Sequence, residues 1–167
     1  MKVSLSIFIT VSLAAAAAGV GAAEPESAAA APDFVLKSAA GPNYRLSEQR
    51  GEVVMLAFTA SWCGECNPFL EHVAELAARY GESGVVSFAV SLDRDRRGAA
   101  SVADRADLDF PVLHDPRGDA AKLYDVRKLP HLVLVDRGGR VRHAFSGYRR
   151  GDEQQFLARL RELLREL

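Results

Sequence analysis

The chain has 167 residues, of which 49% are hydrophobic and 26% are charged, a composition typical of one globular domain rather than of a disordered or fibrous protein. Its 21 basic and 22 acidic residues give a formal net charge of −1. The chain as a whole therefore has no electrostatic attraction for nucleic acid or for an anionic membrane, which argues against polyanion binding as its function.

Residues 1–23 have the layout of a secretory signal peptide. A single charge at Lys2 is followed by an uncharged, mostly apolar stretch that ends in small residues. We expect this segment to be cleaved and the mature protein to be periplasmic or otherwise extracytoplasmic. Because the uncharged stretch is long enough to cross a bilayer, membrane anchoring by an uncleaved N-terminus is the alternative. Residues 24–31 are rich in Ala and include Pro, so we expect a tether there and a folded domain over residues 32–167.

After the tether, strand and helix patterns alternate. Phe34–Leu36 and Tyr44–Leu46 indicate two short strands on either side of a turn at Gly41-Pro42. Val53–Phe58 is an unbroken apolar run, which is typical of a strand covered on both faces. The next segment predicts a helix closed by Gly81, and its apolar side chains on one face are Phe69, Val73, Leu76 and Tyr80.

Four further elements are predicted in the middle of the chain. Val85–Val90 indicates a strand, and Arg96–Ala106 indicates a helix. Phe110–Leu113 predicts a short strand at the edge of the sheet, a position compatible with Pro111 because proline has no backbone N–H to donate. A helical turn is expected over Asp119–Tyr124.

The C-terminal segments indicate an antiparallel ending. Leu132–Val135 and Val141–Phe145 flank a turn at residues 136–139 that contains two glycines, as a hairpin requires. Apolar residues from Phe156 to Leu167 recur at helical spacing, which predicts a final amphipathic helix. The order of elements predicts an α/β fold whose sheet is parallel in its first half and antiparallel in its second.

The chain has two cysteines, Cys63 and Cys66. In an exported protein such a pair is ordinarily a structural disulfide. However, so short a ring gains only about 2 kcal/mol, against about 4.7 kcal/mol for a long loop. A structural zinc site needs two more Cys or His ligands, and the sequence has no second cysteine pair and no HxxxH pattern. We therefore interpret the pair as a redox couple.

The motif Trp62-Cys63-Gly64-Glu65-Cys66 lies between the predicted buried strand and the helix after it, where open α/β sheets place their sites. The N-terminus of a helix stabilises a thiolate and lowers the pKa of Cys63 below the free value of about 8.5. We expect Cys63 to be the nucleophile and Cys66, one turn further and facing the core, to resolve the mixed disulfide. The Glu65 carboxylate opposes the thiolate and is expected to tune its pKa.

Several segments together match one family. They are Phe34-Val35-Leu36, Tyr44-Arg45-Leu46-Ser47-Glu48, Gly51-Glu52-Val53-Val54, the Trp-Cys-x-x-Cys motif, Phe110–Asp115, Tyr124–Pro130 and Asp136–Gly139. On these segments, residues 32–167 resemble the TlpA/ResA-like thiol-disulfide oxidoreductases, exported members of the thioredoxin superfamily. The resemblance implies a thioredoxin-like fold with an N-terminal β-hairpin extension and a central insertion. It also implies reduction of protein disulfides with electrons from a membrane thiol donor. We expect a monomer that uses neither a cofactor nor a metal.

The resemblance also assigns residues around the cysteines. It implies a cis Leu129–Pro130 bond beside the disulfide, with the free backbone of Leu129 pairing with a substrate strand. His131 stands where the family commonly has Thr, and we expect it to titrate near the site. Trp62, next to the reactive cysteine, is expected to shield it and to contact substrate.

The sequence departs from the family pattern at other positions. Ala57 stands six residues before the first cysteine, where thioredoxins have a buried Asp and the relatives often have Asn, so the usual proton acceptor for the second cysteine is missing. Phe69 and Glu71 stand where many relatives have Glu and Pro. The pair Asn67-Pro68 predicts that the helix restarts there, with Asn67 as its N-cap.

Two other functions stay open on the sequence. A copper-handling protein would use Cys63, Cys66 and a histidine, because soft thiolates select Cu(I). A thiol peroxidase is disfavoured, because we find neither the Gln and Trp partners of glutathione peroxidases nor the Pro and Thr that precede a peroxiredoxin cysteine. The segment Asp93–Gly98 has some likeness to a calcium loop, but Arg97 stands where an oxygen ligand is needed, so we interpret it as a solvated charged turn.

Overall fold

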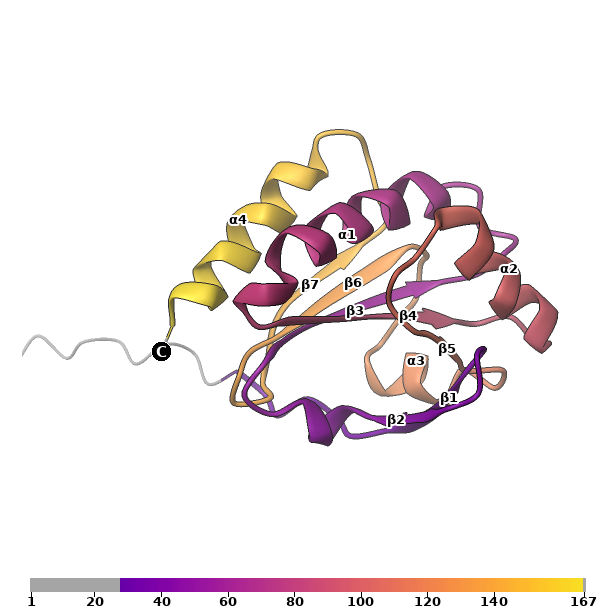
Figure 1. Cartoon of the computed structure of the whole chain (residues 1–167), viewed down its shortest axis with the longest axis horizontal. Coiled ribbons are helices and arrows are strands. Elements are labelled where there is room, and N and C mark those ends of the chain that lie inside the picture. Colours follow the sequence, from indigo (N-terminus) through magenta and orange to yellow (C-terminus); the bar gives the residue numbers. More distant parts are fainter. Residues whose placement is uncertain (1–27, 167) are drawn as a thin grey trace, which may run out of the picture.

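The computed structural model describes residues 28–166 and shows a seven-stranded sheet with helices on both faces (Figure 1). The strands are β1 (Val35–Ser38), β2 (Asn43–Arg45), β3 (Val53–Thr59), β4 (Val85–Ser91), β5 (Val112–His114), β6 (His131–Val135) and β7 (Val141–Ser146). The helices are α1 (Cys66–Tyr80), α2 (Arg96–Ala106), α3 (Asp119–Leu123) and α4 (Asp152–Arg165), with short 3-10 turns at η1 (Leu46–Gln49) and η2 (Gly81–Ser83).

The sheet is mixed, with strand order β2-β1-β5-β4-β3-β6-β7. β3 and β5 run parallel to β4, whereas β6 is antiparallel to β3 and β7 is antiparallel to β6. The β1–β2 hairpin lies at the other side of the sheet. The thioredoxin-like α/β fold, its mixed sheet and its N-terminal hairpin are thereby confirmed.

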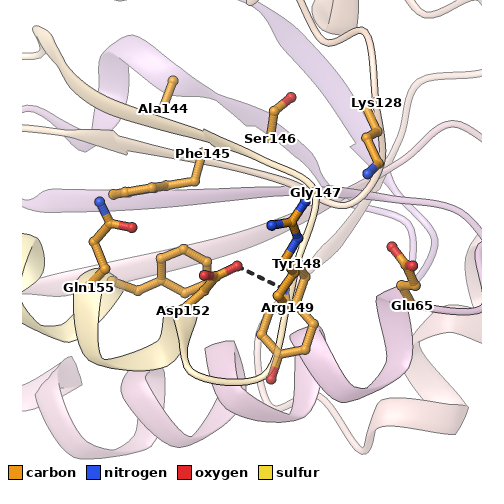
Figure 2. A pocket seen from close by; sticks show the side chains of 11 residues that line it. Glu65, Lys128, Ala144, Phe145, Ser146, Gly147, Tyr148, Arg149, Asp152 and Gln155 are labelled. Carbon is orange, nitrogen blue, oxygen red and sulfur yellow. Dashed lines mark hydrogen bonds between the residues drawn. The ribbon is translucent and has the colours of Figure 1, made fainter.

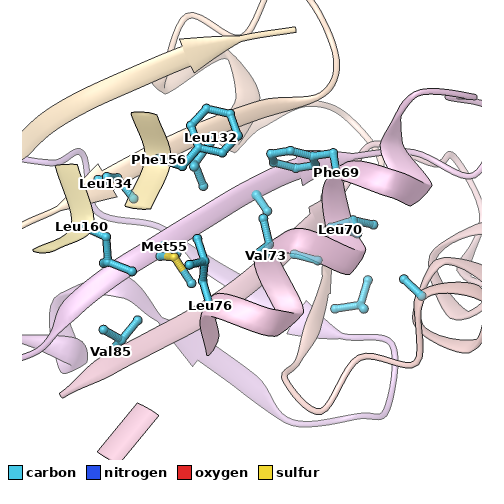
Figure 3. Close-up of a cluster of buried hydrophobic side chains, with 14 of the residues drawn as sticks. Met55, Phe69, Leu70, Val73, Leu76, Val85, Leu132, Leu134, Phe156 and Leu160 are labelled. Atoms are coloured by element: carbon cyan, nitrogen blue, oxygen red, sulfur yellow. The ribbon is translucent and has the colours of Figure 1, made fainter. Parts of the chain in front are cut away.

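The central strand β3 has all seven residues buried because helices cover both of its faces. Its odd-numbered side chains from Val53 to Ala57 pack with α1, α2 and α4, and Figure 3 shows this cluster. Its even-numbered side chains from Val54 to Phe58 pack on the other face with α3. Since successive side chains of a strand point to opposite faces, the unbroken apolar run is what a two-sided core requires.

The prediction that the strand at residues 110–113 lies at the edge of the sheet is wrong. β5 pairs with β4 on one side and with β1 on the other, where Lys37 is opposite His114. The physical reason is that the N-terminal hairpin returns from far along the chain and covers this strand. Pro111 is tolerated because it precedes β5, where its carbonyl accepts a hydrogen bond from the Ala89 N–H at 3.1 Å.

The N-terminal end of the described chain packs on the β6–β7 turn. The Ala31 N–H donates to the Gly139 carbonyl, and the Val141 N–H donates to the Ala29 carbonyl, each at 2.9 Å. Packing therefore begins a few residues before position 32, where the sequence places the start of the domain. The predicted signal peptide and the first four residues of the predicted tether, 24–27, lie outside the described residues. Between residues 28 and 166, none of the helices is long and apolar enough to span a membrane.

Candidate active site

Cys63 and Cys66 form a disulfide with an S–S distance of 2.07 Å and a Cα–Cα distance of 5.4 Å. It lies where the chain leaves the carboxyl end of β3 and enters α1. Cys66 is 1% exposed within the core, whereas Cys63 is partly exposed in the preceding turn. Only one of the two bonded residues is therefore readily reached from solvent.

The helix after the disulfide begins at Cys66, with Glu65 at its N-cap position. The prediction that Asn67 caps a restarted helix is wrong, because Asn67 already lies inside the first turn. Pro68 also fits in this turn, since the first N–H groups of a helix have no intrahelical partner. The turn is closed by the Cys66 N–H, which donates to the Cys63 carbonyl at 3.2 Å.

An apolar cleft of about 400 Å³ opens beside Cys63. Trp62 forms one wall with 69% of its surface exposed, and Leu92, Val126 and Leu129 contribute the other apolar side chains. A large aromatic side chain that stays in solvent beside a reactive group offers contact area for a partner. The cleft is thus suited to an apolar side chain next to the disulfide.

The predicted cis Leu129–Pro130 bond is confirmed. Leu129 lines the apolar cleft, and the Pro130 carbonyl accepts a hydrogen bond from the Gly147 N–H at 2.7 Å. Among the described residues, the Leu129 backbone has no partner in the turn and loop hydrogen bonds, and β6 begins only at His131. Its peptide groups are therefore available to an incoming strand.

A second cavity of about 410 Å³ lies between β7 and the start of α4 (Figure 2). Glu65 and Lys128 line this cavity and the apolar cleft alike. Arg149 and Asp152 add one charge of each sign, and the Arg149 N–H donates to the Asp152 carboxylate at 2.8 Å. The surface around the disulfide is therefore apolar on one side and polar, with balanced charge, on the other.

A model of the AhpC/TSA family matches residues 28–144 of this chain. The chain belongs to the AhpC/TSA family. The cis proline was implied by the resemblance to the TlpA/ResA-like oxidoreductases, and that resemblance is confirmed by the named relatives of this chain.

Named relatives of this AhpC/TSA protein are thiol-disulfide oxidoreductases. It is 34% identical to the thiol-disulfide oxidoreductase ResA of Geobacillus kaustophilus over 119 residues. The aligned region covers 71% of this chain and 68% of the relative. A solved Chlorobium tepidum protein assigned as the thiol:disulfide interchange protein DsbE is 32% identical, with a TM-score of 0.79. The match covers 84% of this chain and 99% of that protein. The exposed lipoprotein thioredoxin of Streptococcus pneumoniae is 31% identical, with a TM-score of 0.66, and the match covers 79% of this chain and 100% of that protein. The AhpC/TSA protein is a thiol-disulfide oxidoreductase.

Two departures of this oxidoreductase from its family serve the core. Ala57 and Phe69 both belong to the cluster between the sheet and α1. Phe69 is 1% exposed and lies edge-on to Tyr148 and Phe156, with ring centroids 5.9 and 6.2 Å away. Apolar side chains therefore fill two positions where the family resemblance implies polar ones, and neither can accept a proton from Cys66.

His131 is 6% exposed and lies on the sheet face opposite α1, against the ring of Phe58. Its Nδ1 is 3.0 Å from the Ser146 Oγ, while its Nε2 has no hydrogen-bond partner among the described residues. Burial lowers the pKa of His131, and the more distant charge of Asp125 raises it less. The histidine is thus a buried, neutral side chain of β6 at neutral pH.

The interpretation of residues 93–98 as a solvated turn is wrong for its first member. Asp93 is 5% exposed and hydrogen-bonded to Ser61, two residues before Cys63. The sequence did not reveal that Asp93 is buried, because it stands in a run of charged residues that is typical of a solvent-exposed turn. Within residues 28–166, no group of three His, Cys, Asp or Glu side chains is arranged to hold a metal ion.

Proposed function

We propose that this oxidoreductase is exported and reduces protein disulfides, with Cys63 as the attacking residue and Cys66 as the resolving residue. The observation that carries the proposal is the exposure of Cys63 on the apolar cleft while Cys66 is 1% exposed. A polypeptide disulfide therefore reaches Cys63 first. The position of both at the start of α1 supports the same roles, because the free N–H groups there stabilise a thiolate.

The reaction starts from the dithiol. The Cys63 thiolate attacks one sulfur of the substrate disulfide, and the other substrate sulfur leaves as a thiolate that takes up a proton. The Cys66 thiolate then attacks the Cys63 Sγ, which releases the second substrate thiol and closes the Cys63–Cys66 disulfide. Two electrons pass to the substrate, and the enzyme is left in the oxidised form present in the structure.

The substrate is proposed to lie as an extended strand along Leu129 and Pro130. The unpartnered Leu129 backbone supports this, since main-chain groups at an open position pair with an added strand. Trp62 then covers the reacting sulfurs on the apolar side of the site. Glu65 and Lys128, which line both cavities, face the substrate between its apolar and polar contacts.

Export of the protein is proposed from the signal-like pattern of residues 1–23, with a membrane thiol donor returning the two electrons to a monomeric enzyme. The exposed lipoprotein among the solved relatives supports a location outside the cytoplasm. The mass of the protein recovered from the extracytoplasmic fraction tests this proposal. A chain that begins near residue 24 is expected, and a full-length chain in the cytoplasm would contradict export.

The roles of the cysteines are tested with insulin as the disulfide substrate and a small dithiol as electron source. The wild-type protein is expected to accelerate insulin reduction, and both Cys63→Ser and Cys66→Ser are expected to lose this turnover. When the variants are reduced, freed of the dithiol and then mixed with insulin, Cys66→Ser should accumulate a mixed disulfide with the substrate, because no second enzyme thiol resolves it, while Cys63→Ser should not. A stable mixed disulfide formed through Cys66 would contradict the assignment.

A further inference from the structure

One buried carboxylate, that of Asp93, is hydrogen-bonded to the loop that carries the redox motif. Asp93 follows β4 and accepts hydrogen bonds from the Ser61 N–H at 2.8 Å and from the Ser61 Oγ at 2.6 Å. The Ser91 Oγ donates to the same carboxylate at 2.7 Å. Both carboxylate oxygens are therefore engaged, and two of the three bonds hold the residue before Trp62.

The third polar group of Ser61 is bound as well. Its carbonyl accepts a hydrogen bond from the Arg105 guanidinium at 3.2 Å, and the Ser101 Oγ accepts one from the same guanidinium at 3.1 Å. The N–H, the hydroxyl and the carbonyl of Ser61 are thus all tied to the segment that runs from β4 into α2. We call Asp93, Arg105 and Ser61 the loop clamp.

The surroundings are built around Asp93. A Cβ at Gly98 would lie 2.6 Å from the Asp93 Cγ, so α2 approaches this carboxylate closely only because residue 98 is glycine. The His114 Nε2 lies 2.8 Å from the Asp93 carbonyl. Burial raises the pKa of Asp93, but the hydrogen bonds from Ser61 and Ser91 outweigh it and hold the pKa below its usual value. Asp93 is therefore anionic at neutral pH and an acceptor only.

We propose that Asp93 is a positioning residue for the redox couple: by fixing Ser61, it holds Cys63 within reach of Cys66 and so favours the disulfide over the dithiol. Closing the bond oxidises both thiols, with two electrons and two protons passing to the disulfide that is reduced. An intramolecular bond forms more readily when its partners are held in place beforehand. The inference requires the Cys63–Cys66 couple but depends neither on which cysteine attacks nor on the substrate.

The first test compares Asp93→Ala with Asp33→Ala in glutathione redox buffers, which need no protein substrate. Asp33 is a matched control, because it accepts the same two bonds from a serine, the N–H of Ser47 at 2.9 Å and its Oγ at 3.0 Å, beside the β1–β2 hairpin rather than the disulfide. Asp93→Ala is expected to shift the equilibrium toward the dithiol by roughly tenfold, a rise in reduction potential of about 30 mV. Asp33→Ala should leave the potential at the wild-type value.

A second variant separates position from charge. In Asp93→Asn, the amide oxygen can accept the Ser61 N–H and Ser91 hydroxyl bonds while the amide nitrogen donates to the Ser61 Oγ, so the clamp is kept and the charge is lost. Removing an anion stabilises a nearby thiolate, but this effect vanishes at a pH well below the pKa of both thiols, whereas loop positioning does not depend on pH. At such a pH we expect Asp93→Asn to match wild type and Asp93→Ala to keep its shift.

Three outcomes would overturn the proposal. They are an unchanged potential in Asp93→Ala, a shift that disappears at low pH, and an equal shift in Asp33→Ala. If Asp93→Ala fails to fold by circular dichroism, Ser61→Ala decides instead, because it removes one clamp bond and keeps the backbone bond. A twofold to threefold shift toward the dithiol is then expected, and a wild-type equilibrium in Ser61→Ala would overturn the proposal.

Discussion

Glu65 separates the two cysteines and lies exposed at the N-cap of α1, where its side chain makes no capping hydrogen bond. Its carboxylate opposes a thiolate at Cys63 through mostly solvated space, against the helix dipole. Glu65→Gln is expected to lower the pKa of Cys63, with a roughly threefold rise in its acid dissociation constant. Because a stabilised thiolate favours the dithiol, the reduction potential should rise by up to about 15 mV.

Thiolate absorbance against pH measures the effect of this substitution. Glu82→Gln, at an exposed residue beyond the far end of α1, is the control and should leave the Cys63 titration unchanged. An equal or higher pKa in Glu65→Gln would mean that the carboxylate points away from the sulfur and does not tune it.

His131 makes stability depend on pH. Its pKa is lowered by burial in the folded state relative to the ordinary value of 6.5, so the unfolded chain binds the proton first as the pH falls. The contribution of neutral His131 to the free energy of unfolding is therefore fully present above about pH 6.5. It decreases as the pH drops toward the folded pKa, by at most about 1.4 kcal/mol per pH unit. His131→Gln should remove this part of the dependence.

Urea unfolding of the oxidised protein at about pH 7.5 and about pH 5.5 checks the prediction. The pKa of His143 is also lowered, mainly by burial and less by the charge of Arg159. His143→Gln therefore serves as a comparison that removes a separate part of the dependence of stability on pH. A slope unchanged by His131→Gln would show that this histidine is not protonated on unfolding in this range.

At the scale of elements, the cluster between the sheet, α1 and α4 depends on aromatic packing. Phe69 of α1 and Phe156 of α4 are each 1% exposed and lie edge-on. Phe69→Ala is expected to destabilise the protein by about 3–5 kcal/mol, as is usual when a buried phenylalanine is truncated. Phe110→Ala, at the partly buried rim of the same cluster, should cost clearly less. Equal costs in denaturant unfolding would contradict a packed contact at Phe69.

The bounds of the helices and strands were largely predictable from the local sequence pattern, whereas the pairing of the strands in the sheet was not. Residues 96–106 form the predicted helix within the same bounds, because periodicity and the cap at Asp95 are local. The place of β5 was not predictable, since its second partner, β1, comes from the other end of the domain. The start of α1 at Cys66 was missed because the Asn67-Pro68 pair has cap-like chemistry that the disulfide turn overrides.

The site was predictable to the same extent. The CxxC pair follows from a short motif and the cis proline from the family resemblance, and in the structure Cys63 and Leu129 line one cleft. Asp93 was not found because its partner Ser61 is 32 residues away in sequence, and a charged segment resembles a solvent-exposed turn. Two features could have marked it: an acidic residue two positions after the end of a buried strand, and a glycine five residues later.

For the whole molecule, the parallel core of the sheet explains where chemistry is placed. β3 and β4 are parallel, so the loops after both strands lie at one edge of the sheet, and they bring Cys63 and Asp93 together through Ser61. The antiparallel β6 enters from the same edge and supplies the Leu129–Pro130 segment. Adjacent strands of one sheet therefore hold the three segments that surround the disulfide.

The proposed mechanism requires that Cys63 be the attacking thiol and Cys66 the resolving thiol, a claim about which thiol is reached from solvent. Competitive alkylation of the fully reduced protein, followed by mass spectrometry of the peptides, measures this. Because Cys63 is exposed at the cleft and Cys66 is 1% exposed, Cys63 should be labelled at least tenfold faster at limiting reagent. Labelling of Cys66 at an equal or faster rate would contradict the claim.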